Sequence, residues 1–208
     1  MNWTIPGTTL EGQRENADRT DGLFQSMFLA GGLTLSQVSS ITGLETYTIQ
    51  NWVKRGFLAP PQSKRYSMEQ VCRIIIINML KGALPLEKIC GMLSYINGDL
   101  TDEADDIIDD AVLYFMFVKL AARARHIGGT QNWDDALEEA TASYVEPHPG
   151  ARERVTKVLR TMLMAQLIDV GVPLVGLSFS FAVDVDTEDI GGFDGVFAEL
   201  PDFVQITI

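Results

Sequence analysis

The 208-residue chain has an ordinary globular share of hydrophobic residues, 46%, which excludes wholesale disorder, and it is long enough for one large domain or two small ones. No apolar run reaches the roughly 18 residues of a membrane span, and the first residues, MNWTIPGTTLEGQREN, lack the basic and apolar segments of a secretion signal. Its two cysteines, Cys72 and Cys90, do not make a disulfide framework, so we expect a cytoplasmic protein that spans no membrane.

The net charge of −12 would argue against nucleic-acid binding if it were spread evenly, but it is not. Residues 34–97 carry seven Lys or Arg against three acids, a local charge of +4. Residues 1–33, 98–146 and 147–208 carry −2, −9 and −5. Because a phosphate contact depends on the local charge, the acidic total does not exclude DNA binding by residues 34–97.

Residues 1–32 predict an N-terminal arm followed by a short helix. The first 22 residues are polar, contain Pro6 and several glycines, and show no sustained periodicity, so we expect a loosely ordered lead-in. A short apolar helical face then follows and ends at Gly31-Gly32. Its members are Leu23, Phe24, Met27, Phe28 and Leu29.

Two short helices joined by a tight turn are predicted next. Thr34 and Gln37 have the spacing of a capping box at the start of a helix over 35–41. Gly43 can end this helix in a left-handed conformation. A second helix, over about 45–55, would bury Ile49, Trp52 and Val53. This arrangement is typical of a helix-turn-helix.

The second helix leaves a polar face that suits DNA. Glutamine and asparagine can each bond bidentately to adenine, hydroxyl groups reach phosphates, and cations neutralise charge. An ordinary solvated helix face would have a similar composition, and the helix alone does not separate the two. The residues of this face are Tyr47, Thr48, Gln50, Asn51, Lys54 and Arg55.

A short basic loop follows Pro60-Pro61 and contains Lys64, Arg65 and Tyr66. It would hang beside the second helix as a wing and contact the sugar–phosphate backbone. Ser67 then caps a helix that runs to Leu80, and a further helix begins after Pro85 and ends at Asn97-Gly98.

The order LTLSQVSSITGLETYTIQNWVKRGFLAPP…KRYSMEQVCRIIIINMLKGALPLEKICGML resembles the N-terminal winged helix-turn-helix of MerR-like transcription regulators, over residues 33–97. The resemblance implies DNA binding through the second helix and the wing. Gln50 and Trp52 stand where such proteins usually have an arginine and a tyrosine, and effector-sensing cysteines after the domain have no counterpart. The chain is more similar to an uncharacterised bacterial MerR-like family with a helical extension, for which no effector is implied.

A long helix is expected over 101–125. Nearly every position from Ala111 to Leu120 is apolar, so two faces need cover. We expect one face to pack on its own chain and the other, within 107–122, on a second subunit, because a homodimer suits paired half-sites on DNA. The alternative is a fully buried core helix in a monomer.

Four carboxylates near the start of this helix have spacing that could suit a metal. Such a site needs ligands from several helices, and no helical Glu-x-x-His is present, so we expect a solvated acidic face and no metal. His126 and His148 are isolated, which also gives no metal site. The carboxylates belong to Asp105, Asp106, Asp109 and Asp110.

Beyond Gly128-Gly129 the sequence predicts helices over 132–144 and 151–170. The pattern then partly alternates, and 174–185 and 203–208 could be strands of a small β ribbon within 174–208. The expected fold is therefore mainly α, with a winged helix-turn-helix domain at 33–98 and a helical dimerisation or regulatory region at 99–208.

Together these features predict a dimeric MerR-like DNA-binding regulator of transcription. No phosphate-binding loop, nucleophile elbow or Cys/His pair is present, so we expect neither an enzyme nor a cofactor. The alternative is a protein-interaction or small-molecule-sensing module that keeps the winged fold without strong DNA binding. A sensing pocket would lie among four aromatic residues and the C-terminal segment; the aromatic residues are Phe115, Phe117, Trp133 and Tyr144.

Overall fold

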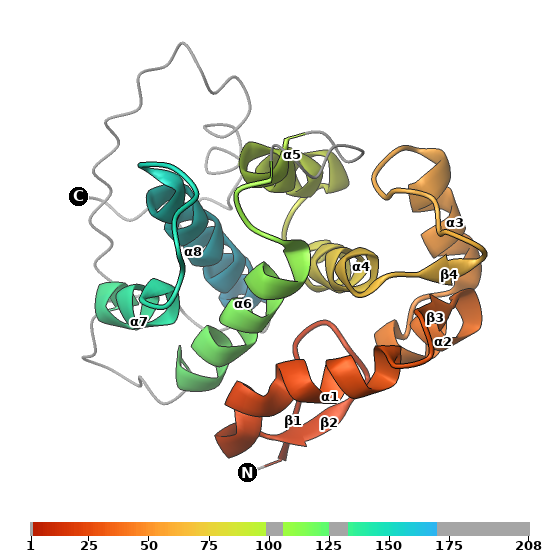
Figure 1. The fold of residues 1–208 in the computed structure, drawn as a ribbon, viewed down its shortest axis with the longest axis horizontal. Helices are drawn as coiled ribbons and strands as arrows, with labels where there is room; N and C mark the ends of the chain where they lie inside the picture. The colour runs from red at the N-terminus through yellow and green to blue at the C-terminus, as the bar shows by residue number, and fades with distance from the viewer. Residues whose placement is uncertain (1, 99–105, 125–132, 170–208) are drawn as a thin grey trace.

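The computed structural model describes residues 2–98, 106–124 and 133–169, with side chains as far as Gln166, and is mainly helical, as expected (Figure 1). In chain order its elements are β1 (Asn2–Thr4), β2 (Glu11–Gln13), the 3-10 helix η1 (Arg14–Arg19), α1 (Thr20–Phe28), β3 (Leu33–Thr34), α2 (Leu35–Thr42), α3 (Thr46–Lys54), β4 (Arg65–Tyr66), α4 (Met68–Leu80), α5 (Leu86–Asn97), α6 (Asp110–Ala124), α7 (Trp133–Thr141) and α8 (Ala151–Asp169). Within these residues, no helix has both the length and the apolar character to cross a membrane.

Helices α4 and α6 form the centre of the molecule. The run Val71–Ile77 of α4 is buried throughout, as expected for a helix that is apolar on nearly all sides. Helix α6 packs on α4, and α8 packs on both. Figure 1 shows α5 and α8 on other sides of this centre, and α2, α3, β3 and β4 together at one end of the molecule.

The predicted starts of α2 and α4 are confirmed. Thr34 and Gln37 form a capping box at α2, and Ser67 and Gln70 form another at α4. In each case the cap side chain accepts a hydrogen bond from a backbone N–H that the helix itself leaves without a partner. Helix α2 ends at Gly43, whose φ of 70° is the left-handed conformation predicted for it.

The N-terminal segment is ordered, in contrast to the loosely ordered lead-in expected from its composition. Strands β1 and β2 pair in antiparallel fashion, and the loop between them packs on α2 and α4. Thr9 Oγ1 donates to Ser40 O at 2.7 Å, and Asn78 Nδ2 donates to both Gly7 O at 3.0 Å and Thr42 O at 2.9 Å. The loop thus provides partners for the last carbonyl groups of α2.

Helix α1 buries a narrower face than predicted. Phe24 is fully buried and packs against Tyr114 and Phe115, with ring centroids 5.8 and 5.4 Å away. Leu23 and Leu29, which were assigned to the same face, are 44% and 86% exposed. Leu29 lies beyond the last residue of the helix, which explains why it does not follow the helical stripe.

Helix α6 begins nine residues later than the start predicted at Thr101. Asp109 Oδ1 accepts hydrogen bonds from the backbone N–H groups of Ala111 and Val112 and so caps it, while Ile107 and Ile108 are buried in a non-helical segment. Residues 101–105 and 125 of the prediction lie outside the described residues.

The face of α6 that was expected to pack on a second subunit is covered by the same chain. Helix α6 packs on η1, α1, α4, α7 and α8. Within 106–124, Val112 is the large hydrophobic residue that stays exposed, at 45%. Most of the described part of α6 is therefore covered by its own chain, and both the homodimer and the monomer stay untested.

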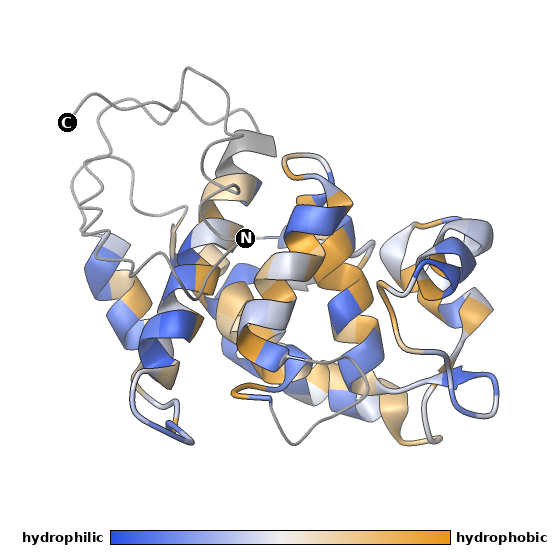
Figure 2. Cartoon of the chain, turned by 90° about the horizontal axis from the view of Figure 1, so that it is seen from above, coloured by the Kyte–Doolittle hydropathy of each residue, from blue (hydrophilic) through white to orange (hydrophobic). Residues whose placement is uncertain are grey.

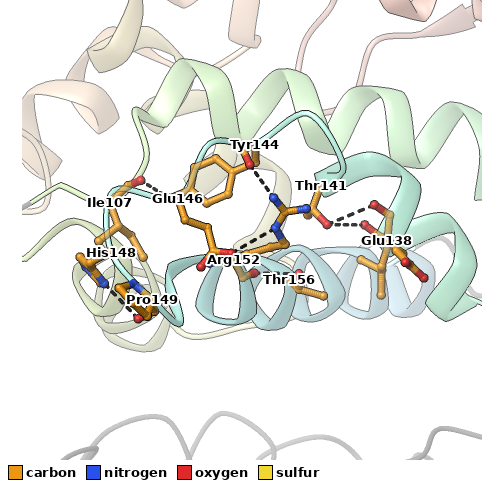
Figure 3. A network of polar contacts seen from close by, with 10 residues as sticks. Ile107, Glu138, Thr141, Tyr144, Glu146, His148, Pro149, Arg152 and Thr156 are labelled. Atoms are coloured by element: carbon orange, nitrogen blue, oxygen red, sulfur yellow. Dashed lines mark hydrogen bonds and ion pairs between the residues drawn. The ribbon is translucent and has the colours of Figure 1, made fainter.

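The connection between α7 and α8 is held by a polar network (Figure 3). Helix α7 ends at Thr141, earlier than predicted, where the Thr141 hydroxyl bonds back to Leu137 O. The Tyr144 hydroxyl donates to Ile107 O, and Arg152 donates to Tyr144 O at 2.8 Å. Helix α8 matches its prediction, whereas the strands predicted at 174–185 and 203–208 lie outside the described residues.

Candidate nucleic-acid interface

One side of α3 carries an exposed polar stripe. Tyr47, Gln50, Asn51 and Lys54 are all exposed, Tyr47 by 70%, and their spacing of three or four residues places them in one row. Ile49 and Trp52 on the opposite side are buried. Trp52 is therefore a core residue, and the α3 stripe, meaning these four exposed residues, presents the groups that could meet a ligand.

The turn between α2 and α3 fixes the direction of the α3 stripe. Leu44 is buried, and its carbonyl accepts a hydrogen bond from Ser39 Oγ at 2.6 Å. Its N–H donates to Thr42 Oγ1 at 3.3 Å. Helix α2 packs on both α3 and α4, so it attaches α3 to the centre of the molecule.

The basic loop forms a tight hairpin turn over 62–65, the 62–65 turn. Arg65 N donates to Gln62 O at 2.8 Å, and Ser63 and Lys64 have φ values of 48° and 63°. Two consecutive positive φ values are the requirement of a type I′ turn, which usually takes Asn-Gly. The serine and lysine are therefore strained here, and strain of this kind is concentrated at functional sites.

Arg65 and Tyr66 follow the turn in β4, which pairs with β3. Arg65 is exposed and donates to Gly32 O at 2.8 Å, so its guanidinium is partly occupied. Tyr66 is 3% exposed, and burial raises the pKa of its hydroxyl. Neighbouring residues of a strand point to opposite faces, and Tyr66 points to the core, so it is less available to DNA than was expected; its assignment as a DNA-contacting residue stays a prediction.

Two further residues of the predicted face are less available than expected. Arg55 donates to Glu87 Oε1 at 2.7 Å, and its guanidinium lies 4.4 Å from the centre of the Phe57 ring. Thr48 is half-buried. The guanidinium of Arg55 is thus held against the start of α5, whereas Lys54 and Lys64 are both exposed.

The local charge of 34–97 is also lower at the surface than the sequence indicates. Arg73 was counted in the +4, but it is 5% exposed and lies in α4, where its Nη1 donates to Asp110 Oδ2 at 3.0 Å. Without it the segment retains a surface charge of +3.

The expectation of a solvated acidic face is wrong for Asp110. This carboxylate is 9% exposed, and besides Arg73 it accepts a hydrogen bond from Asn97 Nδ2 at 3.1 Å. Asp109 caps α6, as described above.

Among the described residues, no group of three or more His, Cys, Asp or Glu side chains is placed to hold a metal ion. Cys72 is buried, which raises the pKa of its thiol well above the usual range.

The aromatic residues proposed to line a sensing pocket belong mainly to the hydrophobic core. Phe117, Trp133 and Tyr144 are buried, and Phe115 packs against Phe24 and Tyr114. A cavity that the structure does contain lies elsewhere, between η1 and α6.

Residues 31–117 match a family described as "Domain of unknown function (DUF1836)". The chain is also similar to "Uncharacterized protein YkrK" of Bacillus subtilis (strain 168), with 32% identity over 84 residues. This similarity covers 38% of the chain and 36% of the relative, so the chain spans about a third of the length of the curated relative that it matches. No solved structure gives a significant match. The family match extends from before β3 into α6, and so includes both Arg73 and Asp110.

Proposed function

We propose that the chain is a DNA-binding regulator of transcription that places α3 in the major groove and the 62–65 turn on the adjacent phosphate backbone. The observation that carries the proposal is the exposed α3 stripe at the same end of the molecule as the strained basic turn (Figure 1). Figure 2 shows this turn as a hydrophilic projection at that end. A helix with polar side chains on its outer side, next to a projecting hairpin, fits the groove and backbone of B-DNA.

Each residue of the α3 stripe has a chemistry that suits one part of the duplex. Gln50 and Asn51 can each bond bidentately to the N6 and N7 atoms of adenine. The Tyr47 hydroxyl and Lys54 are suited to phosphate oxygens on either side. The proposal therefore predicts that specificity depends on Gln50 and Asn51, and that overall affinity depends on the cations.

The 62–65 turn supplies the second phosphate contact. Lys64 is exposed at its tip, and the pairing of β3 with β4 holds the turn against the start of α2. Arg65 contributes a weaker contact, because it already donates to Gly32 O. A turn with fixed φ values keeps the backbone that carries Lys64 in one place, which lowers part of the entropic cost of binding.

A homodimer remains part of the proposal, because two-fold symmetric proteins match paired half-sites on DNA. The segment 107–122 offers a partner little apolar surface, since Val112 is its exposed large hydrophobic residue. We therefore expect the dimer to be formed mainly by other surfaces of the chain.

A salt titration with the full chain tests DNA binding. Fluorescence anisotropy on a pool of labelled genomic fragments would compare the wild type with Lys54→Gln, Lys64→Gln and the control Lys157→Gln on α8. We expect the slope of log affinity against log salt to fall by about one unit for each of the first two variants and to stay unchanged in the control. No binding at low salt, or the same slope in all four proteins, would contradict the proposal.

A protein partner is the second candidate, and a specific observation favours it. The α3 stripe contains a single cation and an aromatic side chain, Tyr47, that is 70% exposed. Exposed tyrosine is enriched in protein interfaces. If α3 binds a protein, Tyr47→Ala should weaken capture of that partner, and the affinity should change little with salt. A steep salt dependence instead supports DNA.

A further inference from the structure

A cavity of about 210 Å³ lies between η1 and α6, on a part of the molecule that the proposed DNA contacts do not use. Three cations line it: Arg14 from η1, and Lys119 and Arg123 from α6. In a chain with a net charge of −12, three cations around one cavity are an unusual concentration of positive charge.

Lys119 and Arg123 lie on the same side of α6, four residues apart. Like charges at this spacing destabilise a helix, unless an anion lies between or beside them. Arg123 is partly compensated by Glu139 of α7, at 3.0 Å. The second wall of the cavity, η1, brings a further cation, Arg14, together with the acids Glu15 and Asp18.

Arg14 supplies an independent observation. Its Nε is buried and has no hydrogen-bond partner among the described residues. Its guanidinium lies over the Trp3 ring, 5.4 Å from the ring centre, which fixes the direction of the group. A buried donor without an acceptor is costly, and an acceptor within the cavity would remove that cost.

The acids of the cavity are more exposed than its cations. Glu15 and Asp18 are exposed, whereas the three cations are half-buried. Ala17 and Ala122, which also line the cavity, are 6% and 5% exposed and give it a small apolar surface. The lining side chains therefore carry three positive and two negative charges beside a short apolar wall, and the size of the cavity suits a ligand smaller than a nucleotide.

We propose that the η1–α6 cavity binds a small organic oxyanion, a carboxylate or a phosphate monoester. A guanidinium group can donate to two oxygens of a carboxylate or a phosphate at once, and Lys119 supplies a compact charge. The ligand would join η1 to α6 and so stabilise the N-terminal segment on the core. This site goes beyond DNA binding, because no residue of the α3 stripe or the 62–65 turn belongs to it.

Thermal unfolding of the full chain tests the site, with inorganic phosphate and succinate as separate probes and sodium chloride at equal ionic strength as the reference. A probe at about 100 times its dissociation constant should raise Tm by about 5 °C. Phosphate and succinate distinguish the two oxyanion types. The site is refuted if neither raises Tm more than sodium chloride does.

Variants separate binding in the cavity from binding elsewhere. Lys119→Gln should lose most of the Tm increase, whereas Lys157→Gln, with the same change of charge on α8, should keep it. Arg14→Lys retains the positive charge but removes Nε, and should weaken probe affinity several-fold by calorimetry even if Lys119→Gln folds poorly. An unchanged response in Lys119→Gln and Arg14→Lys would overturn the proposal.

Discussion

Arg73 of α4 and Asp110 at the start of α6 form a buried ion pair, with Nη1 and Oδ2 3.0 Å apart. Asn97, the last residue of α5, completes the surroundings of the carboxylate. Arg73 Nε also donates to Phe57 O, just after α3, at 3.4 Å. The pair therefore joins α6 to the segment that leaves α3, across the domain boundary that was expected at residue 98.

Breaking this pair should destabilise the whole fold. Arg73→Met leaves a buried carboxylate without its counter-ion, and Asp110→Asn leaves a buried guanidinium without one. We expect each variant to lower the free energy of unfolding by about 3 kcal/mol. The double variant should lose clearly less than the sum, because neither charge is then left alone. Urea unfolding followed by circular dichroism measures all four values.

An exposed ion pair provides the control for that comparison. Lys157 and Glu153 lie 3.0 Å apart on the surface of α8. The same double-mutant cycle on these two residues should give a coupling of about 0.5 kcal/mol or less. A coupling between Arg73 and Asp110 that is equally small would contradict a structural role for the buried pair.

A glycine substitution should relieve the backbone strain in the 62–65 turn. Ser63→Gly removes the penalty of a side chain at φ 48° without changing the charge of the turn, and should raise the free energy of unfolding by about 0.5–1 kcal/mol. Ser36→Gly, in the exposed first turn of α2, should instead destabilise by about 0.5 kcal/mol. Chemical denaturation of both variants measures the difference. Equal effects of the two substitutions would show that Ser63 is not strained.

Variants of Tyr66 distinguish a role of this side chain in packing from a role in DNA contact. Tyr66→Phe keeps the buried ring, so DNA affinity should match that of the wild type, whereas Lys64→Gln should weaken binding at low salt. Tyr66→Ala should cost about 3–5 kcal/mol of stability through the cavity that it leaves. Anisotropy titrations and urea unfolding of the three variants measure these effects. A loss of DNA affinity in a stably folded Tyr66→Phe would instead support the tyrosine hydroxyl as a contact group.

The elements predicted best from the sequence are those set by neighbouring residues. The capping boxes at Thr34 and Ser67 each need a cap and a residue three positions later, and both are visible in the sequence. The burial of Tyr66 was not predicted, although the sequence contained a signal for it. In a paired strand, adjacent residues alternate between faces, so Arg65 and Tyr66 could not both point outward.

Other features depend on contacts between distant parts of the chain. The β1–β2 loop is ordered by hydrogen bonds from Thr9 and Asn78, and no local pattern reveals them. The apolar run of α6 indicated that every side is covered but not by which partner. Arg73 within the run VCRIIII did carry a signal, because a cation on an all-buried helix needs a counter-ion, but the sequence alone did not name Asp110.

Gly7 should be the glycine that the N-terminal segment cannot lose. Its φ is 72°, and a Cβ there would lie 2.7 Å from Ile75 O, so Gly7→Ala combines backbone strain with a clash against α4. We expect the free energy of unfolding to fall by about 2 kcal/mol or more. Hydrogen exchange should also be faster near the end of α2, whose carbonyl groups the loop covers.

Gly22→Ala in α1 is the matched control, since a Cβ there meets nothing within 4 Å. It should stabilise the protein by about 0.5–1 kcal/mol through helix propensity. If both alanine variants were equally stable, the loop could not be holding α2 and α4 together.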